Sequence, residues 1–106
     1  MDEVGTYIIY MKVKGKGVYT VAEAMEAVTE ELKDPDWESW ETTSFYLTTG
    51  EYDLVLIGSA PDDIAVGLAI SLTQTGYVST TVAQAYTAAE TTLLPMGIQK
   101  GLIKHN

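Results

Sequence analysis

The 106-residue sequence has no cysteine and no arginine, and it contains one phenylalanine and one histidine. The absence of cysteine excludes disulfides, thiolate chemistry and zinc sites built on cysteine. Arginine is the side chain that most often recognises phosphates, carboxylates and base edges, and the formal net charge of the chain is −9. Nucleic acids and anionic membranes are therefore not expected as partners.

Long apolar runs are also lacking. No segment approaches the roughly 18 apolar residues that predict a membrane-spanning helix. The opening Met1-Asp2-Glu3 does not have the basic and then apolar design of a signal peptide. We therefore expect a cytoplasmic protein. With 46% hydrophobic residues, the chain can form one core, but a domain of this size gains useful stability from oligomerisation.

The charges are unevenly distributed. Twelve of the 15 acids fall between Glu23 and Asp63, whereas five of the six lysines lie near the two ends of the chain. The main interpretation is solubility through self-repulsion. A neighbouring subunit could also use this asymmetry to fix its register, although exposed ion pairs contribute only about 0–1 kcal/mol each.

Strand and helix patterns alternate along the chain. β-Branched and aromatic runs predict four strands, and apolar residues at helical spacing predict two helices. The expected elements are a strand over 6–14, a helix over 21–33, a strand ending at 48, a strand over 52–59, a helix between 62 and 75, and a strand over 77–86. Thr20 and Glu23 fit a capping box for the first helix. An aspartate of the segment Ala60-Pro61-Asp62-Asp63 is the expected N-cap of the second helix, and Gly76 its C′ residue.

The order β-α-β-β-α-β predicts an α+β, ferredoxin-like fold, with both helices on one face of a four-stranded antiparallel sheet. Residues 1–90 are the expected domain, with a short last helix opening near Thr87. Residues 91–106 are an expected C-terminal extension that packs on its own or a neighbouring subunit.

The strand over 52–59 indicates what covers the other face of the sheet. It follows a hairpin turn at Thr49-Gly50-Glu51 and is apolar at four consecutive positions, Leu54 to Ile57. A strand with one wet face should alternate apolar and polar residues. We therefore expect both faces to be covered, the second one by another copy of the chain. The expected interface residues are Ile8, Tyr10, Trp37, Trp40, Leu56 and Ile57.

The hairpin Phe45-Tyr46-Leu47-Thr48-Thr49-Gly50-Glu51-Tyr52-Asp53 resembles the signature of the GYD-domain family. The opening strand Tyr7-Ile8-Ile9-Tyr10-Met11-Lys12, the segment Ala60–Asp63 and the strand around Val78-Ser79-Thr80-Thr81 also match. The resemblance implies a fold of the dimeric α/β-barrel group, in which two sheets pack face to face, and no established general function. Glu51, inserted between the glycine and the tyrosine, departs from the usual pattern. So do Ser79 and Gln84, where many relatives have basic residues, and the segment Asp34–Glu41.

Asp53 is the strongest candidate for chemistry. A carboxylate at the start of an apolar strand could have a raised pKa and act as a base, with Tyr46 or Tyr10 as polariser. The alternative is that Asp53 accepts hydrogen bonds from turn amides or from threonine hydroxyls and fixes the hairpin. A ligand-binding set would be Tyr10, Tyr46, Thr48, Tyr52, Asp53 and Thr80.

Other motifs predict no cofactor and no metal site. His105 lies next to the C-terminus, where ordered partners are rare. The acids Asp34, Asp36, Glu38 and Glu41 lack the spacing of a calcium loop, and Gly15-Lys16-Gly17 is too short for a phosphate loop. The two tryptophans of this acidic segment are expected to contact the tail or a neighbouring subunit. The favoured function is a non-catalytic homo-oligomeric assembly or small-molecule-binding module. The alternative is a cofactor-independent enzyme that acts on a small apolar or aromatic substrate in a cavity between sheets.

Overall fold

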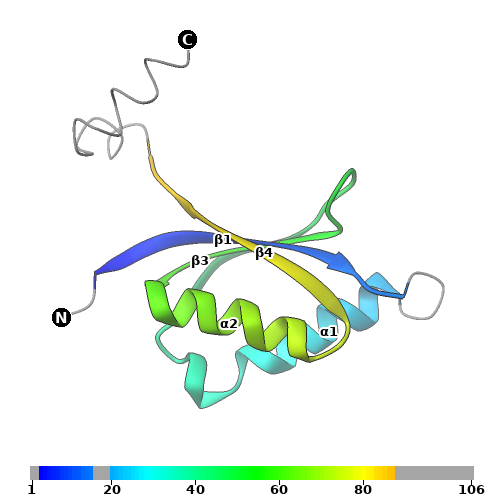
Figure 1. The fold of residues 1–106 in the computed structure, drawn as a ribbon, viewed down its shortest axis with the longest axis horizontal. Coiled ribbons are helices and arrows are strands. Elements are labelled where there is room, and N and C mark those ends of the chain that lie inside the picture. Colours follow the sequence, from blue (N-terminus) through cyan, green and yellow to red (C-terminus); the bar gives the residue numbers. More distant parts are fainter. Residues whose placement is uncertain (1–2, 16–19, 88–106) are drawn as a thin grey trace, which may run out of the picture.

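The computed structural model describes residues 3–15 and 20–87 of the chain. Its elements follow the expected order β-α-β-β-α-β, with a short 3₁₀ turn (η1) before the second strand (Figure 1). The bounds are β1 Val4–Val13, α1 Val21–Leu32, η1 Pro35–Trp37, β2 Glu41–Leu47, β3 Leu54–Pro61, α2 Asp62–Gln74 and β4 Val78–Ala85. The expected last helix beyond Thr87, the extension 91–106 and most of the Gly15-Lys16-Gly17 loop lie outside the described residues.

The four strands form one antiparallel sheet in the order β2-β3-β1-β4. Both helices lie on the same face of this sheet (Figure 1). The α+β class, the antiparallel sheet and the split β-α-β connectivity are therefore confirmed.

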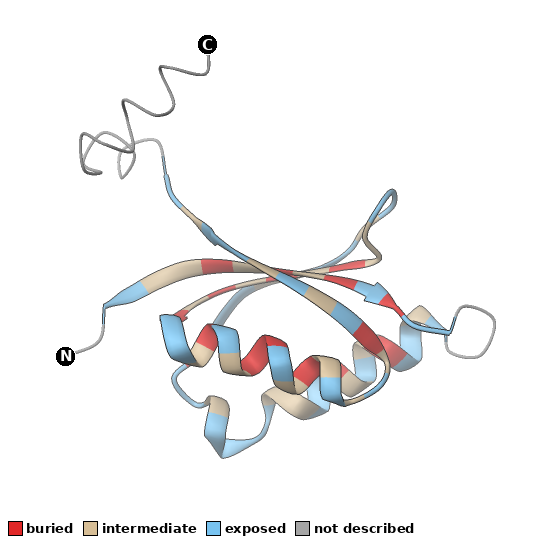
Figure 2. Ribbon diagram, in the orientation of Figure 1, coloured by how far each residue is buried: buried red, intermediate tan, exposed pale blue. Residues whose placement is uncertain are grey.

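The core lies between the sheet and the helices (Figure 2). Because side chains alternate across a strand, one set from each central strand faces the helices. In β1 this set is Tyr7, Ile9, Met11 and Val13, and in β3 it includes Leu54, Leu56 and Ala60. The helices contribute Ala24 and Val28 from α1, and Ala65, Leu68, Ala69 and Leu72 from α2.

The helix ends confirm two of the three predicted caps. Thr20 and Glu23 form a reciprocal capping box, in which each backbone amide donates to the other side chain at 3.0–3.1 Å. Gly76 follows the C-cap of α2 with φ 85°, the left-handed region that favours glycine. The predicted aspartate N-cap is wrong. The N-cap of α2 is Pro61, which has no side-chain acceptor, and Asp62 lies in the first turn.

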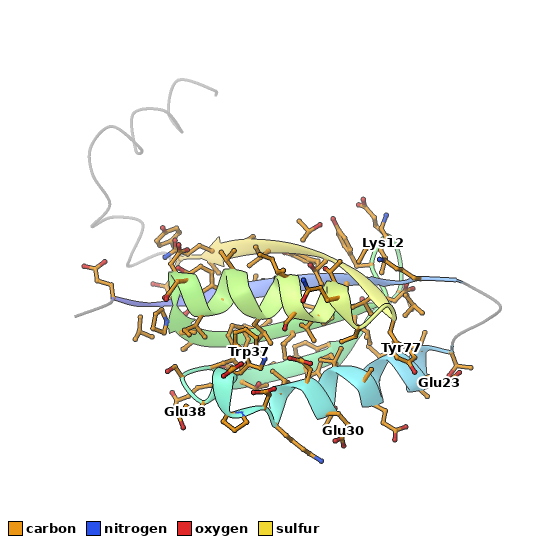
Figure 3. All side chains as sticks on the ribbon, turned by 60° about the horizontal axis from the view of Figure 1, so that its bottom comes forward. Lys12, Glu23, Glu30, Trp37, Glu38 and Tyr77 are labelled. Atoms are coloured by element: carbon orange, nitrogen blue, oxygen red, sulfur yellow. The ribbon has the colours of Figure 1, made fainter. Side chains whose placement is uncertain are left out.

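The acidic tryptophan segment packs against its own domain. Trp40 is only 7% exposed, its ring lies over Gly58 of β3, and its Nε1 donates to Thr42 Oγ1 at 2.8 Å. Trp37, labelled in Figure 3, donates from Nε1 to Glu31 Oε2 at 2.8 Å, and its ring lies close to Gly67 of α2. Both indoles therefore have contacts within the chain. The tail lies outside the described residues, and the expected contacts with it or with a neighbouring subunit stay a prediction.

Candidate functional site: the open face of the sheet

The side of the sheet opposite the helices, here called the open face, has no helix or strand of the described residues over it (Figures 1 and 2). Two rows of paired residues cross its centre. Tyr10 pairs with Val55 on one side and with Thr81 on the other. Ile8 pairs in the same way with Ile57 and Ala83. Strand pairing thus gathers the apolar side chains of three strands in one place.

These central side chains are incompletely buried in the single chain. Ile8, Tyr10, Val55 and Ile57 are half-buried, and Tyr46, which pairs with Val55, is 54% exposed. In β3, buried and half-buried residues alternate regularly from Leu54 to Pro61 although the sequence stays apolar through Gly58. The centre of the open face is therefore apolar and only partly buried in the single chain.

Three tyrosines lie at one end of this face, close to a lysine. The rings of Tyr10 and Tyr52 are 4.9 Å apart between centroids, and Lys12 Nζ lies 5.5 Å from the Tyr52 centroid. Tyr46 belongs to the same row through Val55. Lys12 also lies 3.9 Å from a Glu51 carboxylate oxygen, but both side chains are largely exposed, so this ion pair stabilises little.

The carboxylate of Asp53 is used structurally. Its Oδ2 accepts a hydrogen bond from the backbone amide of Val13 at 2.8 Å. The backbone amide of Asp53 donates to Met11 O, and its carbonyl accepts from Thr48 N, both at 2.9 Å. Asp53 thus ties the β2–β3 hairpin to the end of β1. The expected anchoring role is present, but its donor is an amide of the neighbouring strand and not one of the turn.

The remaining residues of the predicted ligand-binding set do not all share the open face. Thr48 Oγ1 donates to the carbonyl of Tyr52 at 2.8 Å and so closes the hairpin. Thr80 lies on the helix side of β4, where its hydroxyl bonds to Ala69 O and Thr73 Oγ1. Of the six residues, the open face brings together Tyr10, Tyr46 and Tyr52.

The predicted interface set also divides between the two sides of the sheet. Ile8, Tyr10 and Ile57 lie on the open face. Leu56, at 0% exposure, is instead in the core beneath the helices. Trp37 and Trp40 are also on the helix side, as described above.

The sequence did not predict a hollow at the other end of the sheet, beside the start of β1. It has a volume of about 530 Å³ and is lined by Glu3, Val4, Gly5, Tyr7, Asp62, Asp63 and Gln84. The Tyr7 hydroxyl donates to Asp62 Oδ1 at 3.1 Å. Burial, and then the neighbouring Asp62 carboxylate, raise the pKa of Tyr7 above its ordinary value. From the sequence, Tyr7 was noted only as part of the opening strand that resembles the family.

A second, larger hollow of about 740 Å³ runs along α1 and reaches Thr75 and Tyr77 before β4. Its remaining lining residues are Glu23, Glu26, Ala27, Glu30, Glu31, Lys33 and Asp34. No group of three or more His, Asp or Glu side chains in the described part of the chain is placed to hold a metal ion. Asp34 instead accepts from the amide of Asp36 and caps the 3₁₀ turn. His105 lies outside the described residues.

Comparison with known proteins identifies the family. The family model of the GYD domain matches residues 7–94, so the chain belongs to the GYD domain family. No curated protein matches it. Among the described residues, no helix is both long enough and apolar enough to cross a membrane.

Proposed function

We propose that this GYD-domain chain is a non-catalytic homo-oligomeric module, in which the open faces of two copies pack against each other. The observation that carries the proposal is the apolar centre of the open face, formed by Ile8, Tyr10, Val55 and Ile57 and extended by the exposed ring of Tyr46. Contiguous apolar surface of this kind on a small protein marks an interaction site.

A second copy fits this surface for two physical reasons. Two sheets that pack face to face interdigitate side chains across about 10 Å, and the half-buried residues of the central strands provide such side chains. Lys12, near the end of β1, and Glu41, at the start of β2, are the charged strand residues on this side of the sheet, and both lie away from its centre. Two chains of net charge −9 can therefore approach here without placing carboxylates against each other at the centre.

The tyrosine end of the open face supports the small-molecule-binding role of the same module. Tyr10, Tyr46 and Tyr52 offer aromatic surface, and Lys12 offers a positive charge beside the ring of Tyr52. A small aromatic acid suits this combination, because its ring can stack and its carboxylate can pair. With 4-hydroxybenzoate as probe, amide chemical shifts should change around these tyrosines. Shifts scattered over the surface, or none, would count against this role.

The enzymatic alternative has weaker support. It requires Asp53 as a free base in an apolar cavity, whereas the Asp53 carboxylate is bound to the amide of Val13. Neither of the two hollows described above is lined by Asp53.

Neighbouring residues of β3 provide a sharp test of the face-to-face pairing. Ile57 lies on the open face and Leu56 in the core. In a two-fold dimer, Ile57→Asp acts twice, and each lost isoleucine contact removes about 1.5–3 kcal/mol. Together this weakens the dimer by roughly 10²- to 10⁴-fold. The variant should remain folded and separate, whereas Leu56→Asp should unfold the chain, because it places a carboxylate in the core.

The measurement is mass by light scattering during size-exclusion chromatography, with circular dichroism as the check on folding. Ala22→Asp is the matched control, since it adds the same charge at an exposed position of α1. It should leave the mass unchanged. A folded Ile57→Asp variant that keeps the wild-type mass would refute the pairing of open faces.

A further inference from the structure

The two edges of the sheet differ in how well they are protected against pairing. Edge strands expose unpaired amides and carbonyls, and native proteins usually protect them with charges, prolines or bulges. β2 has two such devices, namely Glu41 and a register shift between Thr42 and Ser44. β4 runs for eight residues, Val78–Ala85, with no charge, no proline and no register shift in its pairing with β1.

The register identifies which backbone groups of β4 point away from the sheet. Lys14 N donates to Tyr77 O at 2.8 Å, and hydrogen-bonded pairs alternate along an antiparallel ladder. The residues of β4 that bond to β1 are therefore Ser79, Thr81, Ala83 and Ala85. The amides of Thr80, Val82 and Gln84 face outward, at the end of the described sheet.

The surface beside this edge is also unusual in charge. The sequence contains no Asp, Glu, Lys or Arg from 64 to 89, although the whole chain has 15 acids and six bases. This stretch forms nearly all of α2 and the whole of β4, which lie next to each other (Figures 1 and 3). Thr80 of β4 bonds to Ala69 O and to the Thr73 hydroxyl of α2.

Two apolar side chains of α2 extend the edge. Val66 is 39% exposed and Ile70 is 54% exposed. They are one helical turn apart. Val66 lies three residues before Ala69, and Ile70 lies three residues before Thr73. Both of these later residues bond to Thr80, so Val66 and Ile70 lie beside this contact. The row of Val66 and Ile70 therefore runs along the outer side of the contact between α2 and β4.

We propose that the β4 edge, together with Val66 and Ile70 of α2, is a second self-association surface, which pairs with the same surface of another copy. Two identical strands can pair in antiparallel orientation around a two-fold axis, so that each outward amide of one strand meets a carbonyl of the other. The result is a continuous sheet through two chains.

The lack of charge on this surface favours another copy of this chain as the partner. At net charge −9, most surfaces of two copies repel each other, and self-association is favoured where carboxylates are absent. This surface is distinct from the open face, so it extends the face-to-face dimer to four or more chains. A closed tetramer forms if the two symmetry axes meet, and a longer assembly forms if they do not.

Val82 offers a direct test with a matched control. Val82→Pro removes an outward amide, and proline is tolerated in an edge strand where the amide faces away from the sheet. Val82→Ala removes a similar amount of side-chain packing but keeps the amide. By light scattering, the wild type and Val82→Ala should have the mass of four or more chains, and Val82→Pro the mass of two. Equal masses for all three proteins, or equal loss in both variants, would overturn the proposal.

A surface charge provides the second variant, in case the proline disturbs folding. Ile70→Glu adds a carboxylate to the proposed surface, and Ala22→Glu adds one to exposed α1. Only Ile70→Glu should reduce the mass to that of two chains, and no change with Ile70→Glu would overturn the proposal.

The proposals for the two interfaces can be tested independently of each other. A wild-type dimer that Ile57→Asp converts to a monomer, and that Val82→Pro leaves intact, would refute edge pairing and support the open face. The reverse pattern would support edge pairing and refute the pairing of open faces. A monomeric wild type would refute both.

Discussion

Replacement of Gly58 by alanine should be among the most damaging single-methyl additions in this protein. An added Cβ would lie 2.5 Å from Trp40 Cε2 and 2.6 Å from the carbonyl oxygen of Glu41. Carbon atoms pack favourably at about 3.5–4.0 Å, so the indole has to move by roughly 1 Å. Overpacking of this kind costs about 1–3 kcal/mol. If the indole leaves its site, the loss approaches that of a buried aromatic residue, about 3–5 kcal/mol.

The assay is urea unfolding followed by tryptophan fluorescence, which reports directly on the displaced ring. We expect Gly58→Ala to lower the free energy of unfolding by about 1–5 kcal/mol, a large part of the 5–15 kcal/mol typical of a domain. In a Trp40→Ala background the penalty should shrink but persist, because the backbone oxygen of Glu41 remains close. A change below about 0.5 kcal/mol, the range of ordinary surface substitutions, would show that the contact between Gly58 and Trp40 does not constrain the fold.

Three further outcomes follow from the described contacts. Asp53→Ala should lower the free energy of unfolding in urea by about 1–3 kcal/mol, because the amide of Val13 loses its acceptor. Asp53→Asn keeps an acceptor oxygen and should lower it less. Equal losses in the two variants would contradict this role of Asp53. The raised pKa of Tyr7 favours the neutral phenol in the fold, so stability is present below the unfolded value of about 10 and is lost as the pH rises through the folded pKa. In absorbance titrations, Tyr7→Phe should remove a late tyrosinate component and Tyr46→Phe should not; a late component that survives Tyr7→Phe would assign it elsewhere. Added salt should strengthen self-association, because it screens the repulsion between like charges. If salt weakened the association instead, ion pairs would be holding the chains together and the prediction would be wrong.

The order of elements could be predicted because local patterns determine it. Three such patterns are the capping box at Thr20 and Glu23, the glycine after α2 and the β-branched and aromatic run of β1. Each depends on residues within one turn or one strand. The apolar character of both faces of β3 was also visible, because it needs only the composition of neighbouring positions. Such features do not require knowledge of which segments meet in space.

The side on which each residue lies could not be predicted so well. Leu56 and Ile57 are both aliphatic, so the sequence does not say which one faces the helices, and a shift by one residue exchanges them. The face on which Thr80 lies could not be predicted either, since it depends on the pairing of β4 with β1. Trp40 contacts Gly58 only because β2 and β3 pair in the observed register. These contacts join distant segments, and they decide which residues could meet a partner.

The distribution of charge provides the strongest link between this fold and association. The acids of the described chain lie mainly on α1, on the 3₁₀ turn, at the hairpin and at the start of α2. The fold places these elements so that the centre of the open face remains without carboxylates, as does the side formed by β4 and the part of α2 that follows Asp62 and Asp63. A protein of net charge −9 repels its copies in most orientations, and this repulsion leaves few approaches that can lead to a stable contact. Apolar, uncharged surfaces on such a chain are therefore consistent with the directional self-association proposed above rather than with non-specific aggregation.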